Sequence, residues 1–317
     1  MKIRYLVIAL IIFSFASIFI GVTDLSLSEL FQFDDEQVHI LLVSRLPRLM
    51  GILIAGMSMG IAGLIMQQLS KNKFVSPTTA GTLDSARFGI IVSMMVFTSA
   101  SPFQKMTISF LFALLGTFIF MKVLEKIQFK NAIFIPLVGL MFGSIIDSAS
   151  TFFAYKNDLI QNMASWMQGD FSMIMSGNYE LMYVTIPILV IAYVYANQFT
   201  IAGMGEDFAS NLGLNYRQVV NIGLIIVALV TASVVLSVGV IPFLGLIIPN
   251  IVTIYQGDHL KKNLVHTALL GALFVLVCDV IGRIIIYPYE IPISLTVGVI
   301  GSGIFIYLLV RRKTYGL

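Results

Sequence analysis

The sequence has few of the residues from which metal centres and disulfides are built. It contains one cysteine, Cys278, so no disulfide can form within the chain and no cysteine-ligated metal site is available. The three histidines, His39, His259 and His266, show no HExxH spacing and have no close acidic neighbours in ligand register. We therefore predict no metal site in this chain.

The short motifs of common enzyme classes are missing as well. The chain has no HExxH, no GxSxG and no paired acidic motif, which argues against an intramembrane enzyme. It also has no GxxxxGK[ST] phosphate loop, so it cannot be its own ATPase. We predict no catalytic residues and no cofactor bound to this chain.

Charged residues are scarce. Only 11% of the residues are charged whereas 58% are hydrophobic, and the mean hydropathy is +0.96, far above that of a soluble domain. The net charge is only +3, and the lysines and arginines lie at the ends of apolar segments instead of forming a basic stripe. The composition predicts a polytopic protein surrounded by membrane lipid and argues against nucleic acid as a partner.

Ten apolar segments follow one another along the chain, and most of them have about the length that crosses a bilayer. They span residues 5–22, 49–69, 80–100, 106–123, 133–153, 181–199, 219–240, 243–255, 264–281 and 293–310. The first could be a signal peptide, but no small-x-small cleavage site follows it, so we expect a retained helix. The fold class predicted is an all-α membrane protein, with a single transmembrane domain over residues 1–317.

The distribution of lysine and arginine predicts the orientation. With the N-terminus in the cytoplasm, thirteen of these residues fall on the cytoplasmic side and five on the outer side. Because the number of spans is even, both termini are expected in the cytoplasm. The same orientation places the loop 201–217 in the cytoplasm.

The sequence of this loop predicts one or two short amphipathic turns interrupted by glycine. The residues that define the pattern are Gly205, Glu206, Ala209, Leu212, Gly213 and Arg217. One interpretation is a solvated connector between two helices, and the other is a segment held by a partner protein.

Three of the outer positive charges lie at segment ends: Arg45 and Arg48 in the RLPR sequence, and Arg283 four residues after Asp279. One interpretation is interfacial snorkelling or a local ion pair between Asp279 and Arg283. The other is a ring of guanidinium groups on the outer face that captures carboxylates of a docking protein.

The second segment has small residues at a spacing that lets helix backbones approach closely, which predicts a central position. These residues are Gly51, Ala55, Gly56, Gly60 and Gly63. The stretch from Asn72 to Pro77 then breaks the helix, either to line a cavity opening or as a plain turn. The eighth segment is short and contains or adjoins Pro242, Gly245 and Pro249, so we expect it beside a pathway.

Asp84, Arg87 and Asp147 fall in or near predicted spans, where charges are costly. Asp84 and Arg87 are three residues apart and could form a self-paired bridge at the membrane edge. The alternative is a polar lining of a pathway or a proton relay. A secondary transporter would use Asp84, Asp147 or Asp279 for proton or sodium coupling.

Several stretches resemble the permease subunits of bacterial type II ABC importers for iron-siderophores, haem and vitamin B12. The resemblance runs from about Arg45 to Arg312 and includes RLPR, the glycine-rich helix, Asn72 with Pro77, Gly205-Glu206, Leu212-Gly213, Gly245-Leu246 with Pro249, and the closing pattern from Asp279 to Gly298. Lys73, Phe74 and Val75 depart from the family text, as does Asn250, where the family usually has histidine.

The resemblance implies the following fold and partners. Two permease subunits, identical or related, enclose a pathway in the bacterial cytoplasmic membrane, and two ABC ATPases, which carry ATP and magnesium, bind the loop 201–217. An extracytoplasmic siderophore-binding protein docks on Arg45, Arg48 and Arg283. The weaker pathway or gate assignments are Asn72, Pro77, Asn131, Ile133 and Asn250.

The function implied by the resemblance is ATP-driven import of a ferric siderophore by alternating access, with the permeases for ferric catecholate siderophores as the branch that this chain most resembles. A haem or cobalamin importer permease is the alternative within the family. A proton- or sodium-coupled secondary transporter is the alternative outside it.

Overall fold

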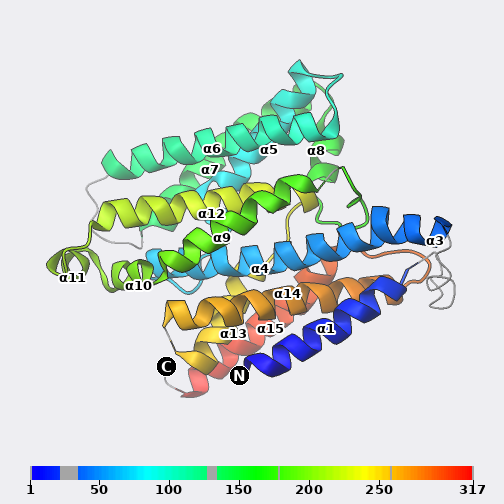
Figure 1. The fold of residues 1–317 in the computed structure, drawn as a ribbon. Helices are drawn as coiled ribbons and strands as arrows, with labels where there is room; N and C mark the ends of the chain where they lie inside the picture. The colour runs from blue at the N-terminus through cyan, green and yellow to red at the C-terminus, as the bar shows by residue number, and fades with distance from the viewer. Residues whose placement is uncertain (1, 22–34, 127–133, 178, 258, 316–317) are drawn as a thin grey trace.

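The computed structural model describes residues 2–21, 35–126, 134–177, 179–257 and 259–315. These residues form a helical bundle (Figure 1), with one isolated β-bridge between Gln168 and Val240. The main helices are α1 (Ile3–Phe19), α4 (Leu46–Leu69), α5 (Thr82–Val96), α6 (Pro102–Lys126), α7 (Phe134–Lys156), α9 (Thr185–Val194), α10 (Ala196–Met204), α12 (Tyr216–Val238), α13 (Leu244–Gln256), α14 (Leu260–Ile284) and α15 (Ile293–Tyr315).

Each of the ten predicted segments contains one or more of these helices. The sixth segment is broken: the 3₁₀ turn η3 (Glu180–Val184) leads into α9, and the axis then bends by 59° into α10. Short helices α8 (Ile160–Met167) and α11 (Glu206–Asn211) lie in connections between spans. The all-α membrane fold predicted from the sequence is confirmed.

Helix α4 lies at the centre of the bundle, as its small residues predict (Figure 1). A Cβ atom added to Gly56 would lie 2.6 Å from the backbone of Ala272 in α14. A Cβ atom added to Gly63 would lie 1.9 Å from the carbonyl oxygen of Gly245 in α13. The two helices therefore contact α4 backbone to backbone, a packing that only residues without side chains allow.

The helix that contains α4 begins earlier than the sequence predicts. A short helix, α3 (Asp35–Ile40), continues through a π-helical turn, η1 (Leu41–Arg45), into α4, and the apolar span covers Gln37–Leu69. Arg45 and Arg48 therefore lie within a continuous helix and do not open it. Their partners in neighbouring helices, described below, make this position tolerable for charged side chains.

Helix α13 has the short length expected from its glycine and prolines. It spans 13 residues and contains Pro249 in its interior. Gly245 is the point of closest contact, because a Cβ atom there would lie 2.5 Å from the Cδ atom of Pro77. The turn that follows α4 is thereby fixed against α13.

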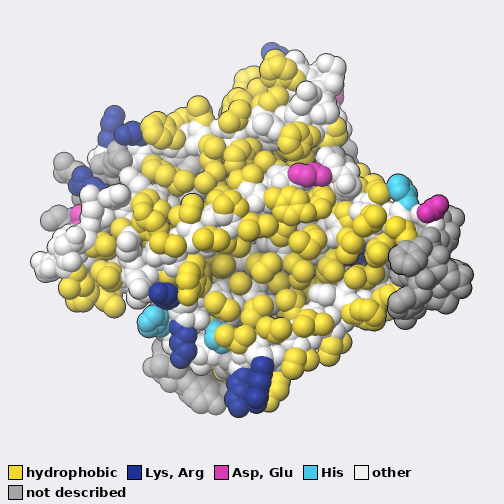
Figure 2. Space-filling model, viewed as in Figure 1, with side chains coloured by type: hydrophobic (Ala, Val, Ile, Leu, Met, Phe, Trp, Pro, Cys, Tyr) yellow, Lys and Arg dark blue, Asp and Glu magenta, His cyan; other side chains and the backbone are white. Residues whose placement is uncertain are grey.

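Most of the molecular surface visible between the two ends of the bundle is apolar (Figure 2). Among the described residues, five helices are long and apolar enough to cross a membrane, or six when the bent pair counts as one span, and three shorter apolar helices accompany them. Large hydrophobic side chains are exposed on α1, α6, α7 and α9, as expected of helices that contact lipid or other membrane-embedded protein.

Candidate functional site

The segment 201–217 folds into a short helix held between two glycine turns. Helix α10 ends at Met204, Gly205 follows with φ +122°, and α11 then ends before Gly213, which has φ +77°. Both positive φ values lie where side chains are strained, so glycine permits the two sharp turns. The predicted pattern of short turns broken by glycine is confirmed.

The side chains of this segment divide between the protein interior and the surface. Ala209 is 0% exposed, and Gly205 is also buried. Leu212 is 60% exposed, and Gly213 and Arg217 are exposed as well, whereas Glu206 is half-buried. Ala209 thus fixes α11 to the bundle, and only the other side of the segment is accessible to a partner.

Two further apolar side chains, Met204 and Phe208, extend this accessible surface. Their exposed fractions are 56% and 48%, and both precede Leu212 at intervals of four residues. We call Met204, Phe208 and Leu212 the apolar face of the loop. Sequence reasoning missed the first two, and helical spacing would not have grouped them, because Gly205 breaks the helix between Met204 and Phe208.

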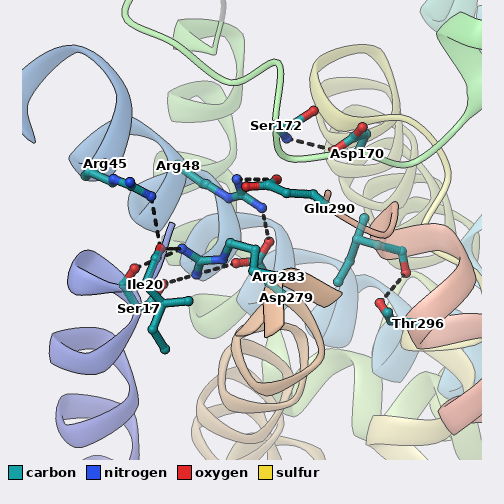
Figure 3. A network of polar contacts seen from close by, with 11 residues as sticks. Ser17, Ile20, Arg45, Arg48, Asp170, Ser172, Asp279, Arg283, Glu290 and Thr296 are labelled. Atoms are coloured by element: carbon teal, nitrogen blue, oxygen red, sulfur yellow. Dashed lines mark hydrogen bonds and ion pairs between the residues drawn. The ribbon is translucent and has the colours of Figure 1, made fainter. Parts of the chain in front are cut away.

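At the opposite end of the bundle, the three outer arginines lie in one buried network (Figure 3). Arg48 contacts Asp279 and Glu290, each at 2.7 Å, and Asp279 also pairs with Arg283 at 2.6 Å. Asp279 therefore lies between two guanidinium groups. Its side chain is only 3% exposed, so this pairing operates largely out of water.

The same network caps the end of α1. Arg45 donates to the carbonyl oxygen of Ile20 at 2.9 Å, and Arg283 donates to the carbonyl oxygens of Ser17 and Ile20 at 2.9 and 2.6 Å. These carbonyls have no partner within the helix, and cations near a helix C-terminus are favourable. The arginines join the end of α1 to the beginning of α4 and the end of α14.

The structure shows the local ion pair between Asp279 and Arg283 that the sequence allowed, and it extends this pair to Arg48 and Glu290. It does not show an outward-facing ring of guanidinium groups, because Arg45 and Arg283 are 8% and 3% exposed. Arg48, with an 11% exposed side chain, and Glu290, with 22%, form the rim of the network. A docking role for the three arginines stays a prediction.

Asn72, Pro77 and Asn250 come together at the end of α4. The side chain of Asn250 donates to the carbonyl oxygen of Lys73 at 2.7 Å, and Asn72 accepts a bond from the backbone N–H of Phe74 at 2.9 Å. Pro77 packs on α13, as described above. Asn131 and Ile133, the predicted gate residues, lie outside the residues that the structure describes.

The intramembrane charges pair differently from the local bridge predicted. Arg87 in α5 forms an ion pair with Asp147 in α7, and its Nε also lies 3.1 Å from the sulfur of Met163. Asp84 instead lies against Gly143, where an added Cβ atom would meet its carboxylate at 2.2 Å. The bridge joins two helices that are distant in sequence, which is why spacing along one helix did not reveal it.

Within the described part of the chain, no group of three or more His, Cys, Asp or Glu side chains could hold a metal ion. The described residues do show an apolar face at one end, a charged network at the other, and closely packed helices between them.

Comparison with known proteins matches residues 9–311 to the model of the FecCD transport family. The chain is 64% identical to the petrobactin import system permease protein YclN of Bacillus subtilis over 99% of this chain and 100% of the relative. It is 38% identical to the ferric-anguibactin transport system permease protein FatD of Vibrio anguillarum, over 93% and 94% of the two chains.

A solved structure described as an inward-facing metal-chelate type ABC transporter has the same fold. Its TM-score is 0.86 at 23% sequence identity, and the match covers 98% of each chain. The likeness shows that this chain shares its fold with that protein over nearly its whole length.

Proposed function

Because this chain belongs to the FecCD transport family, we propose that it is the permease subunit of an ABC importer that carries a ferric siderophore across the membrane. Relatives named for petrobactin import are 64% and 34% identical to it over nearly its full length, and petrobactin is the siderophore we propose. Energy must come from a second protein, since the sequence contains no phosphate-binding loop.

The apolar face of the loop is the observation that carries this proposal. Met204, Phe208 and Leu212 are about half exposed or more at one end of the bundle, with exposed fractions of 56%, 48% and 60%, while Ala209 is fully buried. A rigidly mounted apolar patch of this kind marks a protein-binding surface. We propose that an ABC ATPase binds it.

The distribution of charge supports a cytoplasmic position for this face. In the view of Figure 2, most of the visible lysine and arginine side chains gather toward the end of the bundle where α11 and both termini lie. Positive charge is enriched in the cytoplasmic loops of membrane proteins. The end with α11 is therefore proposed to face the cytoplasm, where ATP is available. The charged network around Asp279 then faces the outer side, where we propose that a siderophore-binding protein docks over Arg48 and Glu290.

In this assembly, a second permease subunit completes the pathway. Binding of ATP draws the ATPases together, and their movement displaces α11 on each subunit. Helices that contact backbone to backbone can change between two packings as rigid bodies, which gives alternating access without a tight binding site in the membrane. A wide passage suits a bulky ferric complex, because a tight site would slow its release.

The test uses the apolar face itself. Phe208→Asp and Leu212→Asp are introduced separately, and the permease is co-expressed with the ATPase of its own transport system. We expect each variant to reach the membrane at the normal level but to lose co-purifying ATPase and uptake of radiolabelled ferric petrobactin, because a carboxylate cannot be buried there without a partner.

Asn211→Asp is the matched control, since this neighbouring residue is exposed and adds the same charge outside the apolar face. Co-purification and uptake that persist in both Phe208→Asp and Leu212→Asp would rule out this surface as the ATPase site. Uptake that depends on a proton or sodium gradient and not on ATP would replace the importer by a secondary transporter.

A further inference from the structure

The cytoplasmic end of α4 is packed directly onto the loop that carries the apolar face. The side-chain amide of Gln68 covers the backbone of Gly203, where an added Cβ atom would lie 2.1 Å from its Nε2 atom. Lys71 extends to the next glycine, and a Cβ atom on Gly205 would lie 2.6 Å from its Nζ atom. One side chain from the last turn of α4, Gln68, and one from the turn that follows it, Lys71, thus lie against backbone on either side of Met204.

The backbone of Lys71 is held in an unusual conformation at this contact. Its φ is +50°, in the left-handed region that glycine normally occupies at a helix end. The backbone N–H of Asn72 bonds to the carbonyl of Gln67 at 3.2 Å, which closes the end of α4 around this residue. Because glycine would adopt this conformation without strain, the lysine at this position is a reason to test its side chain for a role.

The opposite side of the same helix end is bonded to α13. Gln67, which is 5% exposed, donates from its Nε2 atom to the carbonyl oxygen of Leu246 at 3.1 Å. Asn250 donates to the carbonyl oxygen of Lys73 at 2.7 Å. The end of α4 is therefore held between the loop on one side and α13 on the other.

We propose that Gln68 and Lys71 are positioning residues that transmit the movement of α11 to the central helix and, through Gln67, to α13. The inference rests on the proposed function, since it assumes that an ATPase moves α11. Side chains in contact with backbone leave no free space between the two elements. A displacement of the α10–α11 junction therefore shifts α4 with it, and the closely packed α13 follows.

The contact is tested in a complex of permease and ATPase in proteoliposomes. Gln68→Ala and Lys71→Gly remove the two side chains, and glycine also relieves the positive φ at position 71. We expect normal co-purification of the ATPase and continued ATP hydrolysis, but about fivefold or more loss of ferric petrobactin transported per ATP hydrolysed. Lys71→Arg, which keeps a long cationic side chain, should restore much of the transport.

A double-mutant cycle identifies the partner of Gln68. Gly203→Ala alone forces the amide of Gln68 away and should reduce transport, whereas in the Gln68→Ala background the added methyl group has room and should have little further effect. Purely additive effects would contradict a direct contact between the two positions.

Three outcomes would overturn the inference. Normal transport per ATP in Gln68→Ala and Lys71→Gly would show that the contacts transmit nothing. Loss of ATPase binding in these variants would show that they act in docking, and a Lys71→Gly protein that fails to fold would show that the side chain is only a structural cap. Failure of the unmodified permease to bind an ATPase is a separate result, which would reject the proposed function.

Discussion

Replacing Asp279 by asparagine should weaken this protein more than any other single neutralisation of a charge in the outer network. The carboxylate contacts Arg48 at 2.7 Å and Arg283 at 2.6 Å and is 3% exposed. Asparagine keeps the shape of the side chain and one acceptor oxygen but removes the negative charge. Two buried guanidinium groups then face each other without the charge that separates them.

The magnitude follows from the geometry. Two unit charges 4 Å apart attract by about 4 kcal/mol at an effective dielectric constant of ~20, and Asp279 makes two such pairs. Part of this attraction offsets the desolvation of the ions, and removing one partner of a buried pair typically costs about 3–5 kcal/mol. Glu290 retains more solvent, with 22% of its side chain exposed, so Glu290→Gln should cost only about 1 kcal/mol.

The assay is unfolding in mixed micelles with increasing sodium dodecyl sulfate, followed by helix content, with Glu290→Gln as the matched control. Hydrogen exchange over the end of α1 gives a second readout, because Arg283 caps the carbonyls of Ser17 and Ile20. We expect faster exchange there in Asp279→Asn. An unfolding free energy within 1 kcal/mol of the unmodified protein, or equal losses in the two variants, would refute the reasoning.

Three further experiments test separate parts of the structure. Gly63→Ala should prevent the close approach of α4 to α13 and cost about 1–3 kcal/mol in the same unfolding assay, since a methyl group would overlap the facing carbonyl. In a background without the native cysteine, Leu212→Cys should react rapidly with a maleimide in folded protein and Ala209→Cys should not, and equal rates would contradict the burial of Ala209. Asp147→Asn should lower stability by about 2–4 kcal/mol, because Arg87 lies among membrane-spanning helices and would lose its ion-pair partner there, and an unfolding free energy equal to that of the unmodified protein would contradict the pairing.

The sequence by itself determined the class of protein, its spans and the position of its central helix. Apolar content over the length of a bilayer forces helices, since backbone polar groups have no other partners in lipid. The small residues of α4, from Gly51 to Gly63, predicted close helix packing but did not indicate which helices pack there. Gly205 and Gly213 likewise predicted turns, because glycine adopts backbone angles that other residues avoid.

Tertiary structure decided where side chains point and which distant residues meet. Charge asymmetry singled out Arg45, Arg48 and Arg283, yet only the packing of α1, α4 and α14 directed Arg48 and Arg283 to Asp279 and Arg45 to the end of α1. Arg87 meets Asp147 of another helix, and Ala209 turns inward while Phe208 beside it is exposed. Local pattern reflects backbone geometry and burial in lipid, which act along one segment, whereas ion pairs and helix contacts depend on how separate segments are placed in space.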